Sequence, residues 1–193
     1  MSRPRLLLAS TSPRRSRLLN EAGIRFALVE PGPEPMGCGT PVQLALFRAR
    51  EKAVGARFAA GESVPVLGVD TVVDLGGTEF GKAGTREAAE SMLRQLSGRV
   101  HHVHTGHCLH VPATGTTVEE VVTAEVVFTT PTEVQLEAWL ASGLWRGKAG
   151  AYGIQDPLAA FASLHRGPLD AVVGMHVDAV LRLLARVEQE ALQ

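Results

Sequence analysis

The sequence predicts an α/β fold built on a mixed β-sheet. Segments with strand-like and helix-like periodicity follow one another along the chain without strict alternation. Two long strand-like segments, residues 100–111 and 117–128, are separated by a short turn at Ala113-Thr114-Gly115, which predicts an antiparallel pair. A doubly wound parallel sheet needs a crossover helix between successive strands, so we expect a mixed sheet instead.

Length and composition predict one globular domain over residues 1–193. The chain is 45% hydrophobic and 20% charged, and its net charge of -1 excludes a global basic field that would hold nucleic acid. No apolar run approaches the roughly 20 residues that span a membrane, and the apolar stretch near the N-terminus is too short for a signal peptide. Cys38 and Cys108 form no CxxC pair, which is typical of reduced thiols. We therefore expect a cytoplasmic protein that binds neither membrane nor nucleic acid.

The N-terminal elements are a short buried strand and a helix that follows it closely. Leu6-Leu7-Leu8 is typical of a buried strand. Ser12 suits the N-cap of the helix, Pro13 suits its first position, and Gly23 can end it. The next segments are a strand over residues 25–29 and a stiff, proline-rich loop over residues 30–35.

The remaining chain carries further helix and strand signals, and it shows neither an internal repeat nor a linker. Threonine just before a helical stripe is a favourable N-cap and marks three of the helix starts, at Thr40, Thr85 and Thr132. The expected elements are a helix over residues 42–60 ended by Gly61, a strand over 64–75, a turn at Gly76-Gly77, a helix from Thr85 to Leu96, a helix from Thr132, a strand near Phe161 and an amphipathic helix over 177–187.

Ser10, Arg14 and Arg15 lie at the junction of the first strand and the first helix. Free backbone N–H groups and the positive end of the helix dipole point at this junction. Two arginines oppose that dipole, so we expect them to bind an anion, most simply phosphate, rather than to stabilise the helix. The alternative is a capped surface helix with two solvated arginines.

Asp70 lies in an apolar run, Val66 to Val73, where a carboxylate must be paired, hydrogen-bonded or metal-bound. It could ligate Mg²⁺ or act as a base on water. The alternative is a strand-end aspartate that holds a neighbouring loop. Lys52 and Lys82 could be solvated lysines, and they gain a role only if they share a cleft with Asp70 and the arginines.

The glycine-rich segment from Gly147 to Gln155 can bring backbone close to a ligand. Lys148 offers a charge there, Tyr152 a ring that could stack on a base, and Gln155 an amide that both donates and accepts, which suits reading a base edge. The segment is not a Walker motif.

Four metal-ligand types, His102, His104, Cys108 and His110, would share one face of a strand. A straight strand spreads them over about 20–27 Å, too far for one tetrahedral ion. Only His102 and His104 are close enough to share a metal. We therefore expect an exposed, histidine-rich strand.

Taken together and in this order, these stretches resemble the Maf family of nucleoside triphosphate pyrophosphatases. The resemblance covers almost the whole chain. The matching segments are Leu8 to Arg15, Asp70-Thr71, Gly81-Lys82, Leu96 to Gly106, Lys148 to Gln155 and Val172 to Gly174.

The resemblance implies a two-lobed α/β fold around a curved mixed central sheet flanked by helices, similar to the inosine triphosphate pyrophosphatase fold, with the site in the cleft between lobes. It implies hydrolysis of nucleoside triphosphates, and of dTTP and UTP in the subfamily matched here, to the monophosphate and pyrophosphate. This is a house-cleaning activity on the nucleotide pool. A divalent cation, Mg²⁺ or Mn²⁺, and a homodimer are also implied.

Residue by residue, the resemblance makes Asp70 the catalytic acceptor and, with Glu34, the metal ligand. Residues that would hold phosphates are Ser10, Arg14, Arg15, Lys52 and Lys82. Residues that match positions associated with base choice are Arg14, Thr71 and Gln155.

The chain departs from the family pattern at three places. Ala83 replaces a proline after Gly-Lys, Gly174-Met175-His176 replaces Gly-Leu-Pro, and the acidic cluster after the second strand is reduced to Glu34. Two other functions stay open. One is a nucleotide-binding regulator of septum formation with little or no catalysis, and the other is a phosphomonoesterase.

Overall fold

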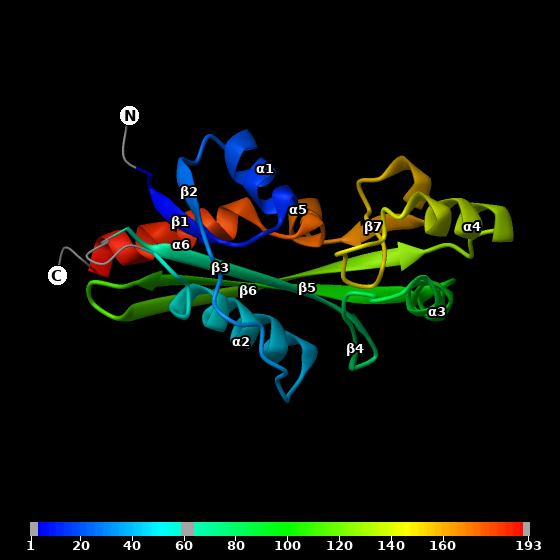
Figure 1. Cartoon of the computed structure of the whole chain (residues 1–193), viewed down its shortest axis with the longest axis horizontal. Coiled ribbons are helices and arrows are strands. Elements are labelled where there is room, and N and C mark those ends of the chain that lie inside the picture. The colour runs from blue at the N-terminus through cyan, green and yellow to red at the C-terminus, as the bar shows by residue number, and fades with distance from the viewer. Residues whose placement is uncertain (1–3, 59–63, 191–193) are drawn as a thin grey trace.

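The computed structural model describes residues 4–58 and 64–190. One seven-stranded mixed sheet runs the length of the molecule, with strand order β2-β1-β3-β5-β6-β7 and with β4 paired only to β3 (Figure 1). The strands are β1 Leu6–Ala9, β2 Phe26–Val29, β3 Val66–Leu75, β4 Thr78–Phe80, β5 Val100–Val111, β6 Thr116–Phe128 and β7 Ala162–Arg166. β1 is parallel to β2 and to β3, and every other pair in the described sheet is antiparallel, which confirms the mixed sheet.

Six α-helices and one 3-10 turn flank this sheet in the described part of the chain. They are α1 Pro13–Glu21, α2 Pro41–Val54, α3 Arg86–Leu96, α4 Glu133–Ser142, the 3-10 turn Pro157–Ala159, α5 Leu169–Val173 and α6 Val177–Glu190. Thr85 and Thr132 cap α3 and α4 with their side chains, as the sequence predicts. None of the helices described is long and apolar enough to cross a lipid bilayer.

Two helix ends differ from the sequence prediction. Ser12 occupies the N-cap of α1, but its side chain makes no capping bond, and the Ser12 N–H instead donates to Ser10 Oγ at 3.2 Å. The prediction that α2 continues to residue 60 is wrong, because α2 ends at Val54 and Gly55 follows. Arg57 pairs with Glu30 in an isolated β-bridge, so the chain is already extended there. Gly61 lies outside the described residues.

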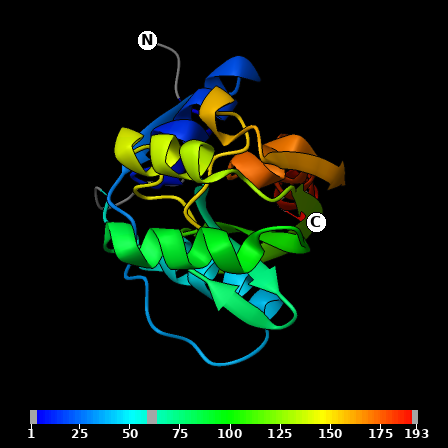
Figure 2. The same ribbon diagram turned by 90° about the vertical axis from the view of Figure 1, so that its right-hand side faces the viewer.

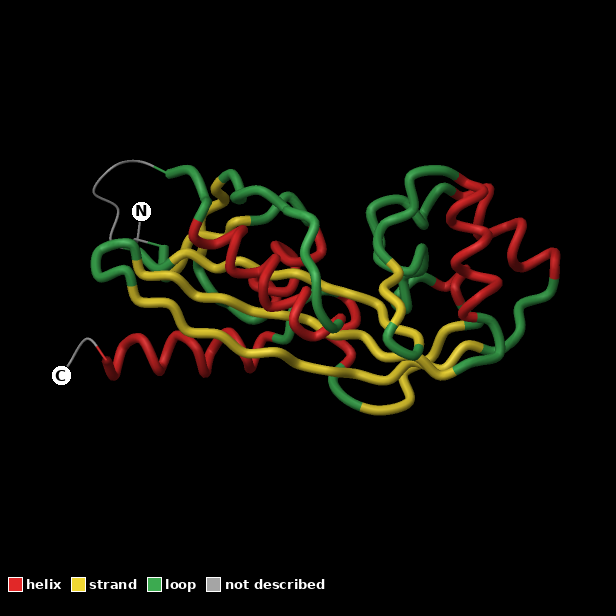
Figure 3. The backbone as a smooth tube through the Cα atoms, turned by 90° about the horizontal axis from the view of Figure 1, so that it is seen from below, coloured by secondary structure: helices red, strands yellow, loops and turns green. Residues whose placement is uncertain are grey.

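The helices gather at the two ends of the long strands and form two lobes (Figures 1 and 3). In the first lobe α1 and α6 pack on one face of the sheet around Leu8, Leu67 and Leu109, and α2 covers the other face. In the second lobe α3 and α4 lie side by side (Figure 2) and enclose Phe128 and Trp139. The helix-flanked mixed sheet with two lobes is therefore confirmed.

The expectation of an exposed histidine-rich strand holds for His102, which is exposed, but is wrong for His104 and Cys108, which are buried. His101, His104 and His107 are all buried on β5, which is an interior strand between β3 and β6. Each ring has a hydrogen-bond partner: His101 Nε2 meets Tyr152 Oη at 2.9 Å, and His104 Nδ1 meets Thr123 Oγ1 at 2.8 Å. His107 Nε2 accepts from the backbone N–H of His176 at 2.9 Å. No cluster of three or more metal-ligating side chains occurs within residues 4–58 and 64–190.

His101 makes folding stability depend on pH. Burial lowers the pKa of His101 to about 4 from its usual 6.5. The unfolded chain therefore binds a proton between about pH 6.5 and pH 4 that the folded chain does not, so stability is present above pH 6.5 and lost as the pH falls toward 4. The shift in the pKa of His101 corresponds to about 3 kcal/mol in the free energy of unfolding.

We expect the melting temperature of His101→Gln, which cannot titrate, to fall less than that of the wild type between pH 6.5 and pH 4. The amide can still meet Tyr152 Oη, so the variant should fold at pH 7.5. Thermal unfolding across this pH range measures the difference in melting temperature between the two proteins. The carboxylates titrate in both proteins, so their contribution cancels in this difference. If the melting temperatures of the two proteins fell in parallel with pH, the pH dependence could not be assigned to His101.

Candidate active site

Two adjoining cavities lie between the lobes and form one cleft. The larger, of about 500 Å³, is lined by the β1–α1 turn, the loop before α2 and the loop after α4, and the smaller, of about 50 Å³, reaches into β3. They share Ser12, Arg14, Arg15, Lys82 and Gly147. Every site residue named from the sequence lines this cleft. The larger cavity holds Ser10, Glu34, Lys52 and Lys82, and the smaller holds Asp70, Thr71 and Gln155.

α2 lies so close to the sheet that only glycine fits beneath it. A Cβ on Gly68 of β3 would lie 2.1 Å from the carbonyl oxygen of Ala49, and a Cβ on Gly106 of β5 would lie 2.4 Å from that of Ala45. This contact of backbone with backbone brings the last turn of α2 against the strand that carries Asp70. It places Lys52, which is 6% exposed, beside Asp70, which is 4% exposed.

Lys52 joins two carboxylates in this cleft. Its Nζ lies 2.5 Å from Asp70 Oδ1 and 3.1 Å from Glu34 Oε2, and Lys82 Nζ lies 3.4 Å from the same Glu34 oxygen. Partial burial alone would raise the pKa of Glu34, but the charges and hydrogen bonds of the two lysines outweigh it and hold that pKa below its usual value. A buried carboxylate and a buried ammonium are tolerated because they pair with each other.

The proline-rich loop positions Glu34. The Gly32 N–H donates to the carbonyl of Lys52 at 3.1 Å, and a Cβ on Gly32 would lie 2.1 Å from the carbonyl oxygen of Glu51. The loop therefore packs directly on the end of α2. Lys82 is held from the second lobe, because it forms an isolated β-bridge with Ala149. Ala83, which replaces the family's proline, is buried in the second-lobe core.

Arg14 and Arg15 bind backbone carbonyls as well as line the cavities. Arg14 donates from Nε to the carbonyl of Val173 and from Nη2 to that of Gly147, both at 3.2 Å. Arg15 donates from Nε to the carbonyl of Gly174 at 2.9 Å and from Nη1 to Ser10 Oγ at 3.1 Å. Burial lowers the pKa of both guanidinium groups. The expectation that the two arginines serve an anion alone therefore misses their second role, which is to fix the loops after α4 and α5.

Thr71 and Gln155 occupy different depths of the smaller cavity. Thr71 Oγ1 lies 3.1 Å from Thr105 Oγ1 and donates to the Gly174 carbonyl at 3.4 Å. Gln155 is exposed at the rim, where its Nε2 donates to Asp156 Oδ2 at 3.2 Å. Tyr152 also lines the cavity, but its ring is only 5% exposed.

Sequence analysis assigns Lys148 a charge that a ligand could use, and Lys148 lines the smaller cavity, but its ammonium group has partners within the protein. Its Nζ bonds the Leu144 carbonyl, lies 3.2 Å from Asp156 Oδ2 and sits 5.4 Å from the ring centre of Trp139. Sequence reasoning also missed Asp170, which accepts from Val177 N and meets His176 Nδ1, both at 2.8 Å, and so fixes the turn at Gly174 that receives Arg15. No spacing in the chain relates Asp170 to Arg15, so the sequence carried no signal for it.

This fold and cleft define a class of α/β domain with an arginine-bearing turn beside a buried carboxylate–ammonium pair. The model of the Maf-like protein family matches residues 5–187. A dTTP/UTP pyrophosphatase of Agrobacterium fabrum is 39% identical over 192 residues, covering 95% of this chain and 92% of the relative. One of Hyphomonas neptunium is 40% identical over 88% of each chain, and one of Chelativorans sp. is 40% identical over 96% of this chain and 92% of the relative. The chain belongs to the Maf family.

The contact of α2 with the sheet can be tested with Gly68→Ala. The added methyl group meets backbone atoms of Ala49 and Ala53 that cannot yield, so α2 must shift. We expect a loss of at least about 2 kcal/mol in the free energy of unfolding, measured in urea. We also expect a longer distance between Lys52 Nζ and Asp70 Oδ1 in a crystal structure of the variant.

The matched control is Gly84→Ala, because a Cβ on Gly84 meets nothing within 4 Å. A Gly68→Ala variant as stable as the control, with Lys52 still against Asp70, would show that the close approach does not set the site.

Proposed function

We propose that this protein hydrolyses nucleoside triphosphates, dTTP and UTP above all, to the monophosphate and pyrophosphate, and so removes nucleotides from the cellular pool. The observation that carries the proposal is the convergence of Arg14, Arg15, Lys52 and Lys82 on the cleft that holds Asp70. Membership of the Maf family and the relatives named dTTP/UTP pyrophosphatase support the same activity.

The cleft suits the charge of the substrate. A triphosphate carries about four negative charges, which basic side chains must offset in a site of low dielectric constant. Arg14 and Arg15 are held by uncharged carbonyls, so their positive charge stays available to phosphate oxygens. Ser10 Oγ accepts bonds from Arg15 and from the Ser12 N–H and donates to no residue in the described ranges, so its hydroxyl proton can be donated to a phosphate.

Asp70 is the residue suited to activate water. Its Oδ1 is fixed by Lys52, whereas Oδ2 accepts no hydrogen bond from the described residues. A water hydrogen-bonded to Oδ2 would attack the α-phosphorus in line, forming a new P–O bond as the bond to the β-phosphate oxygen breaks. Asp70 takes the water proton as base, and pyrophosphate leaves with its charge held by the arginines and lysines.

A divalent cation, Mg²⁺ or Mn²⁺, fits the donor set of this cleft. Asp70 and Glu34 both contact Lys52 Nζ, so two carboxylates lie close together where the triphosphate would enter. One or two carboxylates completed by phosphate oxygens and water are what Mg²⁺ takes at such sites. Bound there, the cation would supply further neutralisation of phosphate charge. Asp70 could serve as its ligand as well as the base.

We expect Asp70→Asn to lower kcat by about 10²–10⁴ while the triphosphate still binds. The amide keeps the shape but cannot take a proton, and Glu34 remains as a charged partner for Lys52. Steady-state kinetics and calorimetric titration with UTP measure the two quantities. Asp178→Asn, an exposed site on α6 away from the cleft, is the matched control. A kcat within a few-fold of the wild type would remove Asp70 from the mechanism.

The base specificity follows from Arg14, Thr71 and Gln155. Uracil and thymine present a carbonyl beside an N–H, and one amide such as that of Gln155 can satisfy both. Thr71, deeper in the same cavity, can add a hydroxyl contact. A 7-methylguanine base is positively charged and would favour a carboxylate, which these three positions lack.

We expect kcat/KM for UTP and dTTP to exceed that for CTP, GTP and 7-methylguanosine triphosphate by at least about tenfold, because a base that leaves polar groups unpaired is rejected. Gln155→Ala should narrow this ratio, whereas Gln95→Ala, on the exposed face of α3, should not. A wild-type preference for the methylated guanine nucleotide would overturn the assignment of Gln155.

The products of one triphosphate separate this function from the alternatives. A pyrophosphatase releases pyrophosphate, a phosphomonoesterase releases phosphate, and a nucleotide-binding regulator of septum formation releases neither. We also propose, on the family resemblance, that the protein is a cytoplasmic homodimer. Light scattering in solution and localisation of a tagged copy in cells measure these two properties.

A further inference from the structure

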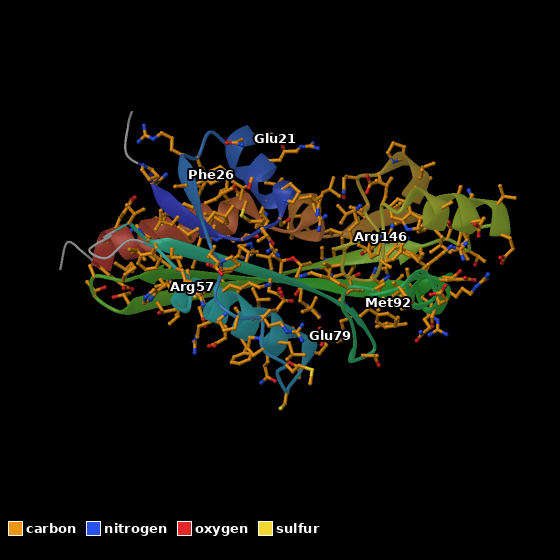
Figure 4. All side chains as sticks on the ribbon, viewed as in Figure 1. Glu21, Phe26, Arg57, Glu79, Met92 and Arg146 are labelled. Carbon is orange, nitrogen blue, oxygen red and sulfur yellow. The ribbon has the colours of Figure 1, made fainter. Side chains whose placement is uncertain are left out.

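Arg146 is a cleft arginine to which neither the sequence nor the proposed mechanism gives a role. It lies on the second-lobe loop after α4 (Figure 4) and lines the larger cavity together with Ser10, Lys52 and Lys82. Its guanidinium carbon sits 4.5 Å from the ring centre of Trp145. The Trp145 ring is itself buried and anchored through Nε1 to the Leu140 carbonyl at 3.1 Å, so it forms a fixed platform.

Gly143 leaves space for the guanidinium of Arg146. A Cβ on Gly143, which has a φ of +68°, would lie 2.5 Å from Arg146 Nη1, so a side chain there would displace the guanidinium. The neighbouring Gly147 carbonyl accepts the bond from Arg14 at 3.2 Å, which ties the Arg146 backbone to the anion-binding turn of the first lobe. The loop that carries Arg146 is thus joined to the first lobe through the residue that follows it.

Arg146 differs from the other cations of the cleft in having no polar partner. Lys52 and Lys82 contact carboxylates, and Arg14 and Arg15 donate to carbonyls. The Arg146 side chain donates no hydrogen bond and makes no ion pair with any residue in the described ranges, and it is exposed. A guanidinium stacked on an indole keeps its N–H donors at its edge, in the plane that suits phosphate oxygens.

Its place along the cleft indicates which phosphates it meets. The smaller cavity holds Asp70, Thr71 and Gln155, and Arg146 does not line it. A triphosphate with its base near Gln155 and its α-phosphorus near Asp70 must extend its β- and γ-phosphates into the larger cavity. We propose that Arg146 is a substrate-binding residue that contacts these terminal phosphates and holds the departing pyrophosphate. The proposal rests on the proposed function for the direction of the substrate.

The decisive variant is Arg146→Gln, compared with Arg99→Gln, an exposed arginine before β5 that lines neither cavity. We expect Arg146→Gln to raise KM for UTP and Kd for inorganic pyrophosphate, each by about tenfold, the size of one charge-assisted contact. The affinity for UMP should stay unchanged, because UMP lacks the terminal phosphates. Arg146→Lys should have KM and Kd values between those of the wild type and Arg146→Gln, because lysine keeps the charge but lacks the planar guanidinium.

Calorimetric titration with inorganic pyrophosphate keeps this proposal separable from the proposed function. If the wild type releases no pyrophosphate from any triphosphate but binds pyrophosphate tenfold more tightly than Arg146→Gln does, the hydrolytic function fails and the anion contact stands. Unchanged pyrophosphate affinity in Arg146→Gln, an equal loss of UMP affinity, or no pyrophosphate binding by the wild type would each overturn the role of Arg146.

Discussion

The site depends on the contact between α2 and the sheet. Gly68 and Gly106 let the helix backbone lie directly on β3 and β5, and this removes the space that any side chain would need. Among the residues that the structure describes, Asp70 and Glu34 are the carboxylates that pair with the buried charge of Lys52. Because an unpaired charge at this depth costs several kcal/mol, the helix, the strand and the proline-rich loop hold one another in a single arrangement.

The arginines and the lysines of the cleft have partners of different charge. Lys52 and Lys82 are largely neutralised by carboxylates, whereas Arg14 and Arg15 meet neutral carbonyl oxygens. Those bonds orient the two side chains and also join α1 to the loops after α4 and α5. The same bonds therefore join the two walls of the cleft.

Local signals in the sequence predicted most of the fold, and it was non-local partners that escaped them. Thr85 and Thr132 cap their helices through residues three positions away, which a local pattern can indicate. The end of α2 depends on a bridge between Arg57 and Glu30, which lie on either side of the helix. His101 is buried because Tyr152, fifty-one residues later, supplies its hydrogen bond. Alternation along a strand cannot distinguish that arrangement from an exposed polar face.

Local sequence signals also fail to distinguish two neighbouring cations of the candidate site. Arg146 and Lys148 are two cations in one glycine-rich segment, and their sequence context is nearly the same. Lys148 turns inward to the Leu144 carbonyl and Asp156, while Arg146 lies over Trp145 at the cavity. Gly147 and Gly150 have left-handed backbone, so the segment that carries the two cations is irregular rather than helical or extended. Both residues line the cleft, Arg146 the larger cavity and Lys148 the smaller one, so the residue types can be read from the sequence. Which of the two has its charge paired by internal partners depends on the fold of the loop.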